Sequence, residues 1–125
     1  MRETAYLADR VFEIIQKETA FPKRSRWLFA KQIADLMNEI LITMEEANKP
    51  EAQTEALRIR RYELQQIVLG KLSALDRIFT QAMRSIPIDP DKLDAVGGHI
   101  NECERLIKAW IKSDEKRYGA VKRSE

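Results

Sequence analysis

The chain has 125 residues, of which 44% are hydrophobic and 34% charged, and its formal net charge is +2. This length suits one domain and supports a hydrophobic core without disulfides or metal, and the single cysteine excludes an internal disulfide and fits a reducing compartment. Residues 1–20 lack a signal-peptide pattern, and no apolar run approaches the roughly 20 residues that span a bilayer. We therefore expect a cytoplasmic protein with no membrane partner.

Apolar periodicity predicts two helices in the first half of the chain. The first is expected at about residues 3–19, where Leu7, Val11 and Ile14 fall on one stripe. A break is expected before Pro22, because the residue before a proline disfavours the α region. The second helix is expected at about 23–48. Its seam, at spacings of four, three and four, consists of Ile33, Met37, Ile40 and Met44.

A third and longer helix is expected at about residues 51–85, after Pro50 has ended the second. One of its apolar stripes consists of Leu57, Leu64, Val68, Leu75, Ile78 and Ala82. Gly70 interrupts the helix at a cost of about 1 kcal/mol relative to alanine. We expect a close approach of a neighbouring helix to be its reason.

The fourth helix is expected at about residues 90–116, with Asp89 as N-cap and Pro90 in the first position. Its seam consists of Leu93, Val96, Ile100, Cys103, Ile107 and Trp110. The pair Gly97–Gly98 is expected to mark tight packing. Four such helices with short connections predict an all-α, antiparallel up-down-up-down four-helix bundle over residues 1–117. We expect the basic tail, 118–125, to be frayed or disordered.

Catalytic and metal-binding patterns are weak. His99 and Cys103 lie four residues apart on the fourth helix, but there is one residue of each kind and no third ligand stands out. Cys103 falls on the apolar seam, which favours a buried structural thiol. No serine elbow and no glycine-rich phosphate loop is present. We expect no enzyme activity, no metal and no cofactor.

Charge is segregated along the chain. Blocks of net charge +4 occupy residues 21–31, 58–84 and 105–125, whereas 32–57 and 85–104 carry −5 and −4. Basic blocks with the aromatic neighbours Trp27, Tyr62 and Tyr118 suit contact with phosphates. The candidate nucleic-acid-binding residues are Lys23, Arg24, Arg26, Arg58, Arg60, Arg61, Arg105, Lys108, Lys112, Lys116 and Arg117.

Two alternatives stand beside this interpretation. The cations can simply form a solvated helix surface, or they can neutralise acidic blocks on neighbouring subunits of an interaction scaffold that binds no nucleic acid. Arg61 is a special case because it falls on the Leu57–Leu64 stripe, which predicts that it is partly buried and paired. Helix three carries a wider apolar surface than one bundle requires, which favours a homo-oligomer.

Two stretches carry a family resemblance: Phe21-Pro22-Lys23 leading through Trp27, and the run 106–113, whose sequence is Leu-Ile-Lys-Ala-Trp-Ile-Lys-Ser. The chain resembles the accessory variability determinant (Avd) proteins of diversity-generating retroelements, and the related proteins encoded by intervening sequences of bacterial ribosomal RNA genes. This resemblance implies a homopentamer of four-helix bundles that binds nucleic acid, RNA or DNA, and a reverse transcriptase partner. It therefore favours a non-enzymatic accessory protein.

Overall fold

The structure is a computed structural model that describes residues 2–16, 23–49, 54–85 and 90–119, with the side chains of 14–16, 23–30, 82–85, 90 and 93 left out. The described residues form four helices and no strand, which confirms the prediction of an all-α fold. The helices are α1 (Arg2–Gln16), α2 (Lys23–Asn48), α3 (Glu55–Ser85) and α4 (Pro90–Tyr118). None of the described helices combines the length and the apolar character that crossing a membrane requires.

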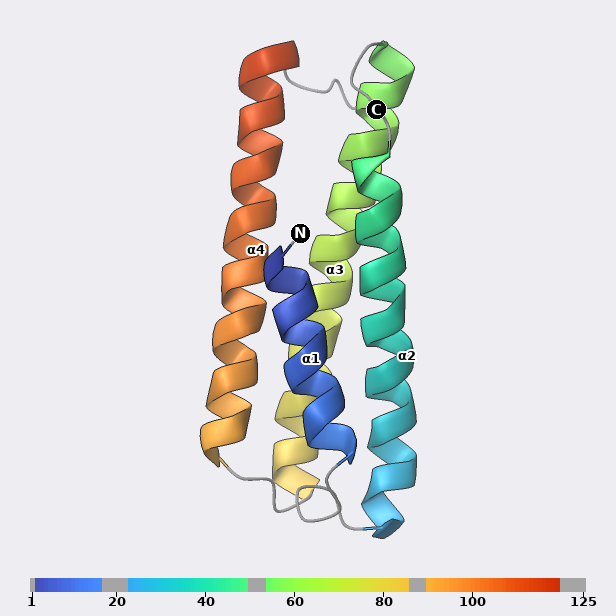
Figure 1. Cartoon of the computed structure of the whole chain (residues 1–125), viewed down its shortest axis with the longest axis vertical. Coiled ribbons are helices and arrows are strands. Elements are labelled where there is room, and N and C mark those ends of the chain that lie inside the picture. Colours follow the sequence, from blue (N-terminus) through green and yellow to red (C-terminus); the bar gives the residue numbers. More distant parts are fainter. Residues whose placement is uncertain (1, 17–22, 50–53, 86–89, 120–125) are drawn as a thin grey trace.

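The four helices pack side by side along the long axis of the molecule (Figure 1). Among the described residues, α1 contacts α2 and α4, and α3 also contacts α2 and α4. In Figure 1 the end of α1, the start of α2, the end of α3 and the start of α4 lie at the lower end. The end of α2 and the start of α3 lie at the upper end. With 15 described residues α1 is the shortest of the helices that the structure describes, and it lies along only the lower half of the bundle.

The core follows the predicted seams. All four residues of the α2 seam are at most 3% exposed, and the described members of the α4 seam up to Ile107 are buried, with Trp110 partly buried against them. Leu57 departs from its predicted stripe, since it is 37% exposed. It lies in the first turn of α3, where the chain has only begun to pack on its neighbours. Leu64 and Val68, further along the same stripe, are buried.

The ends of α3 and α4 are set by caps. α3 begins at Glu55 because the N–H of Leu57 donates to the Thr54 hydroxyl oxygen at 3.2 Å, so Thr54 is the N-cap. α4 continues two residues beyond its expected end, to Tyr118. Gly119, with φ of 88°, then donates its N–H to the carbonyl of Glu115 at 2.8 Å. The remainder of the predicted tail, 120–125, lies outside the described residues, as do 17–19 and 51–53.

The glycines inside the helices do not mark close packing. A Cβ built on Gly70, Gly97 or Gly98 would meet no heavy atom within 4 Å. The expectation that these positions let neighbouring helices approach is therefore wrong within this chain. Gly70 and Gly98 lie on exposed faces.

Candidate nucleic-acid interface

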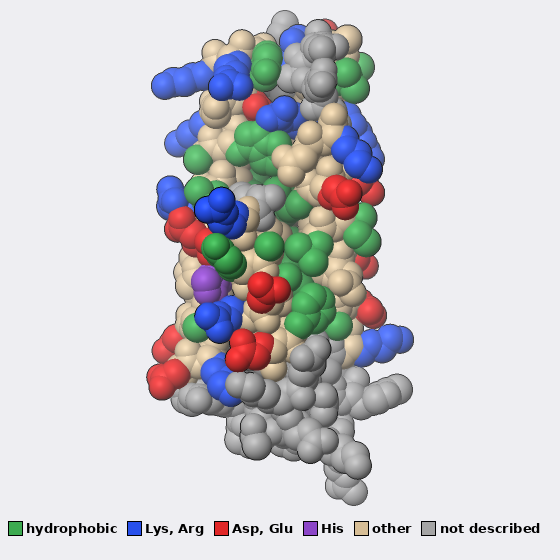
Figure 2. All heavy atoms as spheres, viewed as in Figure 1, with side chains coloured by type: hydrophobic (Ala, Val, Ile, Leu, Met, Phe, Trp, Pro, Cys, Tyr) green, Lys and Arg blue, Asp and Glu red, His purple; other side chains and the backbone are tan. Residues whose placement is uncertain are grey.

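The C-terminal half of α4 presents several of the predicted cations to solvent. Lys108, Lys112, Lys116 and Arg117 are exposed, and none of them forms an ion pair with a residue that the structure describes. The three lysines recur every fourth residue, so they follow one side of the helix with a rise of about 6 Å per step. Figure 2 shows Lys and Arg side chains at the upper left of the molecule, over α4.

Arg105 is exposed as well, but its charge is balanced on the same helix. Its Nε donates to Glu102 Oε2 at 3.0 Å, and a second hydrogen bond joins its Nη2 to Glu102 Oε1. This hydrogen-bonding lowers the pKa of the Glu102 carboxyl and raises the pKa of Arg105. Arg105 therefore adds less free positive charge to the surface than the lysines that follow it.

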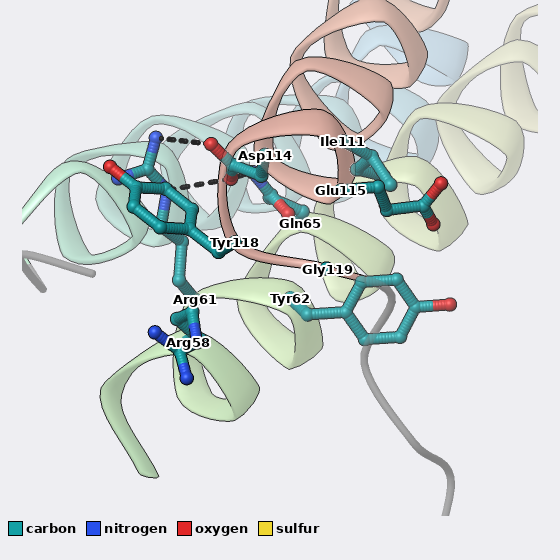
Figure 3. A pocket seen from close by; sticks show the side chains of 9 residues that line it. All are labelled: Arg58, Arg61, Tyr62, Gln65, Ile111, Asp114, Glu115, Tyr118 and Gly119. Carbon is teal, nitrogen blue, oxygen red and sulfur yellow. Dashed lines mark hydrogen bonds and ion pairs between the residues drawn. The ribbon is translucent and has the colours of Figure 1, made fainter. Parts of the chain in front are cut away.

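Arg61 is engaged inside the bundle, as its place on the apolar stripe predicted. Its Nη2 donates to Asp114 Oδ1 at 3.0 Å, and its Nε lies 2.9 Å from Oδ2 without making a hydrogen bond. Gln65 Nε2 donates to the same carboxylate at 3.1 Å. The Arg61 guanidinium also lies 4.7 Å from the centroid of the Trp110 ring. Arg61 therefore joins α3 to α4 and presents little charge to a ligand (Figure 3).

The other two arginines of the predicted cluster differ from Arg61 and from each other. Arg60 Nη1 lies 3.9 Å from Glu63 Oε2 on an exposed face, a contact of little strength in water. The Arg58 guanidinium lies 5.8 Å from the centroid of the Tyr118 ring and has no carboxylate partner among the described residues. Of the three, Arg58 is the one that lies beside α4 with its charge not paired to a described carboxylate.

A small cavity opens between α3 and α4 at this end of the bundle. Its lining consists of Arg58, Arg61, Tyr62, Gln65, Ile111, Asp114, Glu115, Tyr118 and Gly119. In Figure 3 the rings of Tyr62 and Tyr118 lie on opposite sides of Gly119. The empty space is about 290 Å³ with its open mouth included. The sequence pointed to both tyrosines as aromatic neighbours of the cations, but not to the acidic and amide groups between them.

The basic entry of α2 is only partly placed. The backbone of Lys23, Arg24 and Arg26 forms the start of α2, as predicted. Their side chains lie outside the described residues, so their part in the candidate interface stays a prediction.

His99 and Cys103 both lie near the first turn of α1 but differ in burial. His99 Nδ1 lies 2.7 Å from Glu3 Oε1, a contact that joins α4 to the first turn of α1. Cys103 is fully buried, and burial raises the pKa of its thiol to about 11. Within the described part of the chain, no group of three His, Cys, Asp or Glu residues could hold a metal ion.

The described residues thus form an all-helical protein in which cations without an ion-pair partner and two tyrosines lie at one end of α3 and α4. Comparisons of the chain with protein-family models, with curated proteins and with solved structures give no match.

Proposed function

We propose that this chain is a non-enzymatic, cytoplasmic accessory protein that binds nucleic acid through the basic end of α3 and α4. The proposal includes an antiparallel up-down-up-down bundle, which the cyclic order of helix contacts and the shared ends of successive helices support. It also includes assembly into a homo-oligomer. The resemblance to Avd proteins supports a pentamer and a reverse transcriptase as the protein partner.

One observation carries the proposal. The three lysines of α4, Lys108, Lys112 and Lys116, are exposed and form no ion pair with any described residue, although the chain holds almost as many acidic as basic groups. A surface that only needed solubility would gain little from keeping three cations unpaired along one side of a helix. Unpaired cations on one face are what phosphate binding requires, because each contact releases a condensed counterion.

The test is a salt titration of binding. A variant with Lys108, Lys112 and Lys116 all replaced by Gln is compared with the parent protein, by fluorescence anisotropy with labelled RNA and DNA. We expect weaker binding to every sequence and a slope of log K against log salt that is shallower by about 2 for single strands, from a slope of about −0.7 per phosphate contact.

The matched control replaces three cations elsewhere with Gln, namely Arg10, Lys49 and Arg77, which are exposed on α1, beyond α2 and on α3. It changes the net charge equally, so a general charge effect would weaken both variants alike. Circular dichroism and light scattering should be unchanged in both. Equal binding by the lysine variant and the parent across the salt series would refute α4 as the interface, and the α2 entry would be tested next.

A second function, a scaffold that binds only protein, is favoured by a different surface. Ile42 on α2 and Ile67 on α3 are 56% and 43% exposed, and Gly70 lies one turn along α3 on an open face. The ion pair between Lys71 and Glu39, at 2.7 Å, joins α2 to α3 close by. An Ile42→Glu/Ile67→Glu variant is examined by light scattering for assembly and by anisotropy for binding of labelled RNA. A scaffold that binds only protein loses assembly and binds no RNA before or after the change, whereas an accessory protein of the first kind still binds RNA through each subunit.

A further inference from the structure

The cavity between α3 and α4 combines charges of both signs in a way that a phosphate-binding site would not. Asp114 and Glu115 contribute carboxylates to its lining. Asp114 is neutralised by Arg61, whereas Glu115 is exposed and forms no ion pair with a described residue. A phosphate would be repelled by Glu115, but the amino group of a nucleobase would not, since carboxylates accept hydrogen bonds from such groups. The lining therefore suits a base better than a phosphate.

The aromatic groups of the cavity point to the same ligand. Tyr118 is 38% exposed, so part of its ring is open to solvent, and the Arg58 guanidinium lies over it at 5.8 Å. Tyr62 lies on the other side of the opening (Figure 3). Aromatic rings and arginine planes are the surfaces on which unpaired bases stack.

The size of the cavity limits what can enter. Its enclosed space is about 20 Å³, which is room for about one water molecule and far below the roughly 300–1,000 Å³ of small-molecule sites. A flat ring can therefore lie against the opening but cannot enter it. In a duplex every base is paired and stacked inside the helix, so its flat face cannot reach a surface between two protein helices.

The lysines of α4 supply the path for the backbone of such a strand. Lys108, Lys112 and Lys116 extend over about 12 Å along the helix that ends at Tyr118. Cations and an exposed aromatic ring on one helix are the combination by which proteins hold single strands. Lys116 and Tyr118 lie two residues apart and point to different sides of α4, so a strand that contacts both turns around the end of this helix. A flexible strand can place its phosphates along the row and turn one base toward the cavity.

We propose, on the basis of the proposed function, that this end of the bundle prefers single-stranded nucleic acid and stacks one unpaired base on Tyr118 at the mouth of the α3–α4 cavity. The lysines contribute affinity through the phosphates, and the Tyr118–Arg58 pair contributes the preference for an unpaired base. The two contributions differ in their salt dependence, because stacking releases no counterions.

The experiment measures the binding of a labelled 12-nucleotide DNA strand and of its duplex to the full chain, by anisotropy over a salt series. For Tyr118→Leu we expect the single strand to bind about 5- to 150-fold more weakly, the range that corresponds to loss of one base-stacking contact, with an unchanged salt slope. Duplex binding should not change. Tyr118→Phe, which keeps the ring, should bind like the parent.

Tyr6→Leu is the matched control, because Tyr6 is a 50% exposed tyrosine on α1 and far along the chain from the cavity. Two results would overturn this inference. One is that Tyr118→Leu binds the single strand as tightly as the parent does, and the other is that the parent binds the duplex as tightly as the single strand. In either case the proposed function stands if the α4 lysine variant binds more weakly. Absence of binding to both probes would overturn the proposed function as well.

Discussion

Asp114 is the carboxylate through which α3 and α4 are joined at the upper end of the bundle. It accepts hydrogen bonds from Arg61 and Gln65 at 3.0 and 3.1 Å. Its replacement by alanine removes both acceptors at once. The Arg61 side chain is only 19% exposed, so its guanidinium is then left between two helices without a counter-ion.

The cost can be estimated from these contacts. Hydrogen bonds to charged groups contribute about 1.5–3 kcal/mol each, and removing one partner of a fully buried ion pair costs about 3–5 kcal/mol. Here each side chain is about one-fifth exposed, so water compensates in part, and Trp110 still faces the guanidinium. We therefore expect Asp114→Ala to lower the free energy of unfolding by about 2 kcal/mol. For a chain of this length that lowers Tm by roughly 6–10 °C.

The assay is thermal and urea denaturation followed by circular dichroism, with parent and variant at the same protomer concentration because assembly would affect Tm. Glu102→Ala is the control, since it removes a carboxylate from the exposed pair with Arg105, and we expect no measurable change. An Arg61→Met/Asp114→Leu variant should recover part of the loss, because apolar replacement removes both charges together. The reasoning is refuted if Asp114→Ala melts within a degree of Glu102→Ala.

Three further predictions concern α4. The buried Cys103 thiol, whose pKa burial raises from 9.0 to about 11, should react with a disulfide reagent at pH 8 only after denaturation. The raised pKa favours the neutral thiol in the folded state, so the stability that this thiol contributes is present below pH 9 and is lost as the pH rises towards 11. Denaturation of the parent and of Cys103→Ala, each below pH 9 and near pH 11, should show that the variant loses less stability between the two pH values than the parent does. Gly98→Ala should raise the free energy of unfolding by about 1 kcal/mol in urea denaturation, since its Cβ would meet nothing within 4 Å. A lower stability would show that this face is covered by another molecule.

The helices were predictable because burial imposes a strong period on the sequence. Ile33, Met37, Ile40 and Met44 recur at helical spacing and all lie in the core. Leu57 was misplaced because periodicity says which face a residue occupies, but not whether a neighbouring helix reaches that far. The same limit applies to Gly70, whose cost in the helix is visible in the sequence while its surroundings are not.

The candidate site was predictable only in its residue types. The burial of Arg61 followed from its place on an apolar stripe, but its partner Asp114 lies 53 positions away and no local pattern relates the two. For the same reason, three arginines within four residues looked like one patch. Their side chains leave α3 in different directions, so one pairs internally, one meets Glu63 and one lies over Tyr118.

Because the first helix is short, we expect it to open locally at a lower free energy than the rest of the bundle. α1 is held by the buried side chains of Leu7, Ala8 and Val11, and by the contact between Glu3 and His99. α3 retains both of its neighbours, α2 and α4, when α1 detaches. Amide hydrogens of α1 should therefore exchange with solvent through a local opening that costs less than global unfolding, whereas those at the centre of α3 should exchange only when the whole domain opens. The first helix is thus the part of this protein that can leave and return while the basic end of α3 and α4 stays assembled.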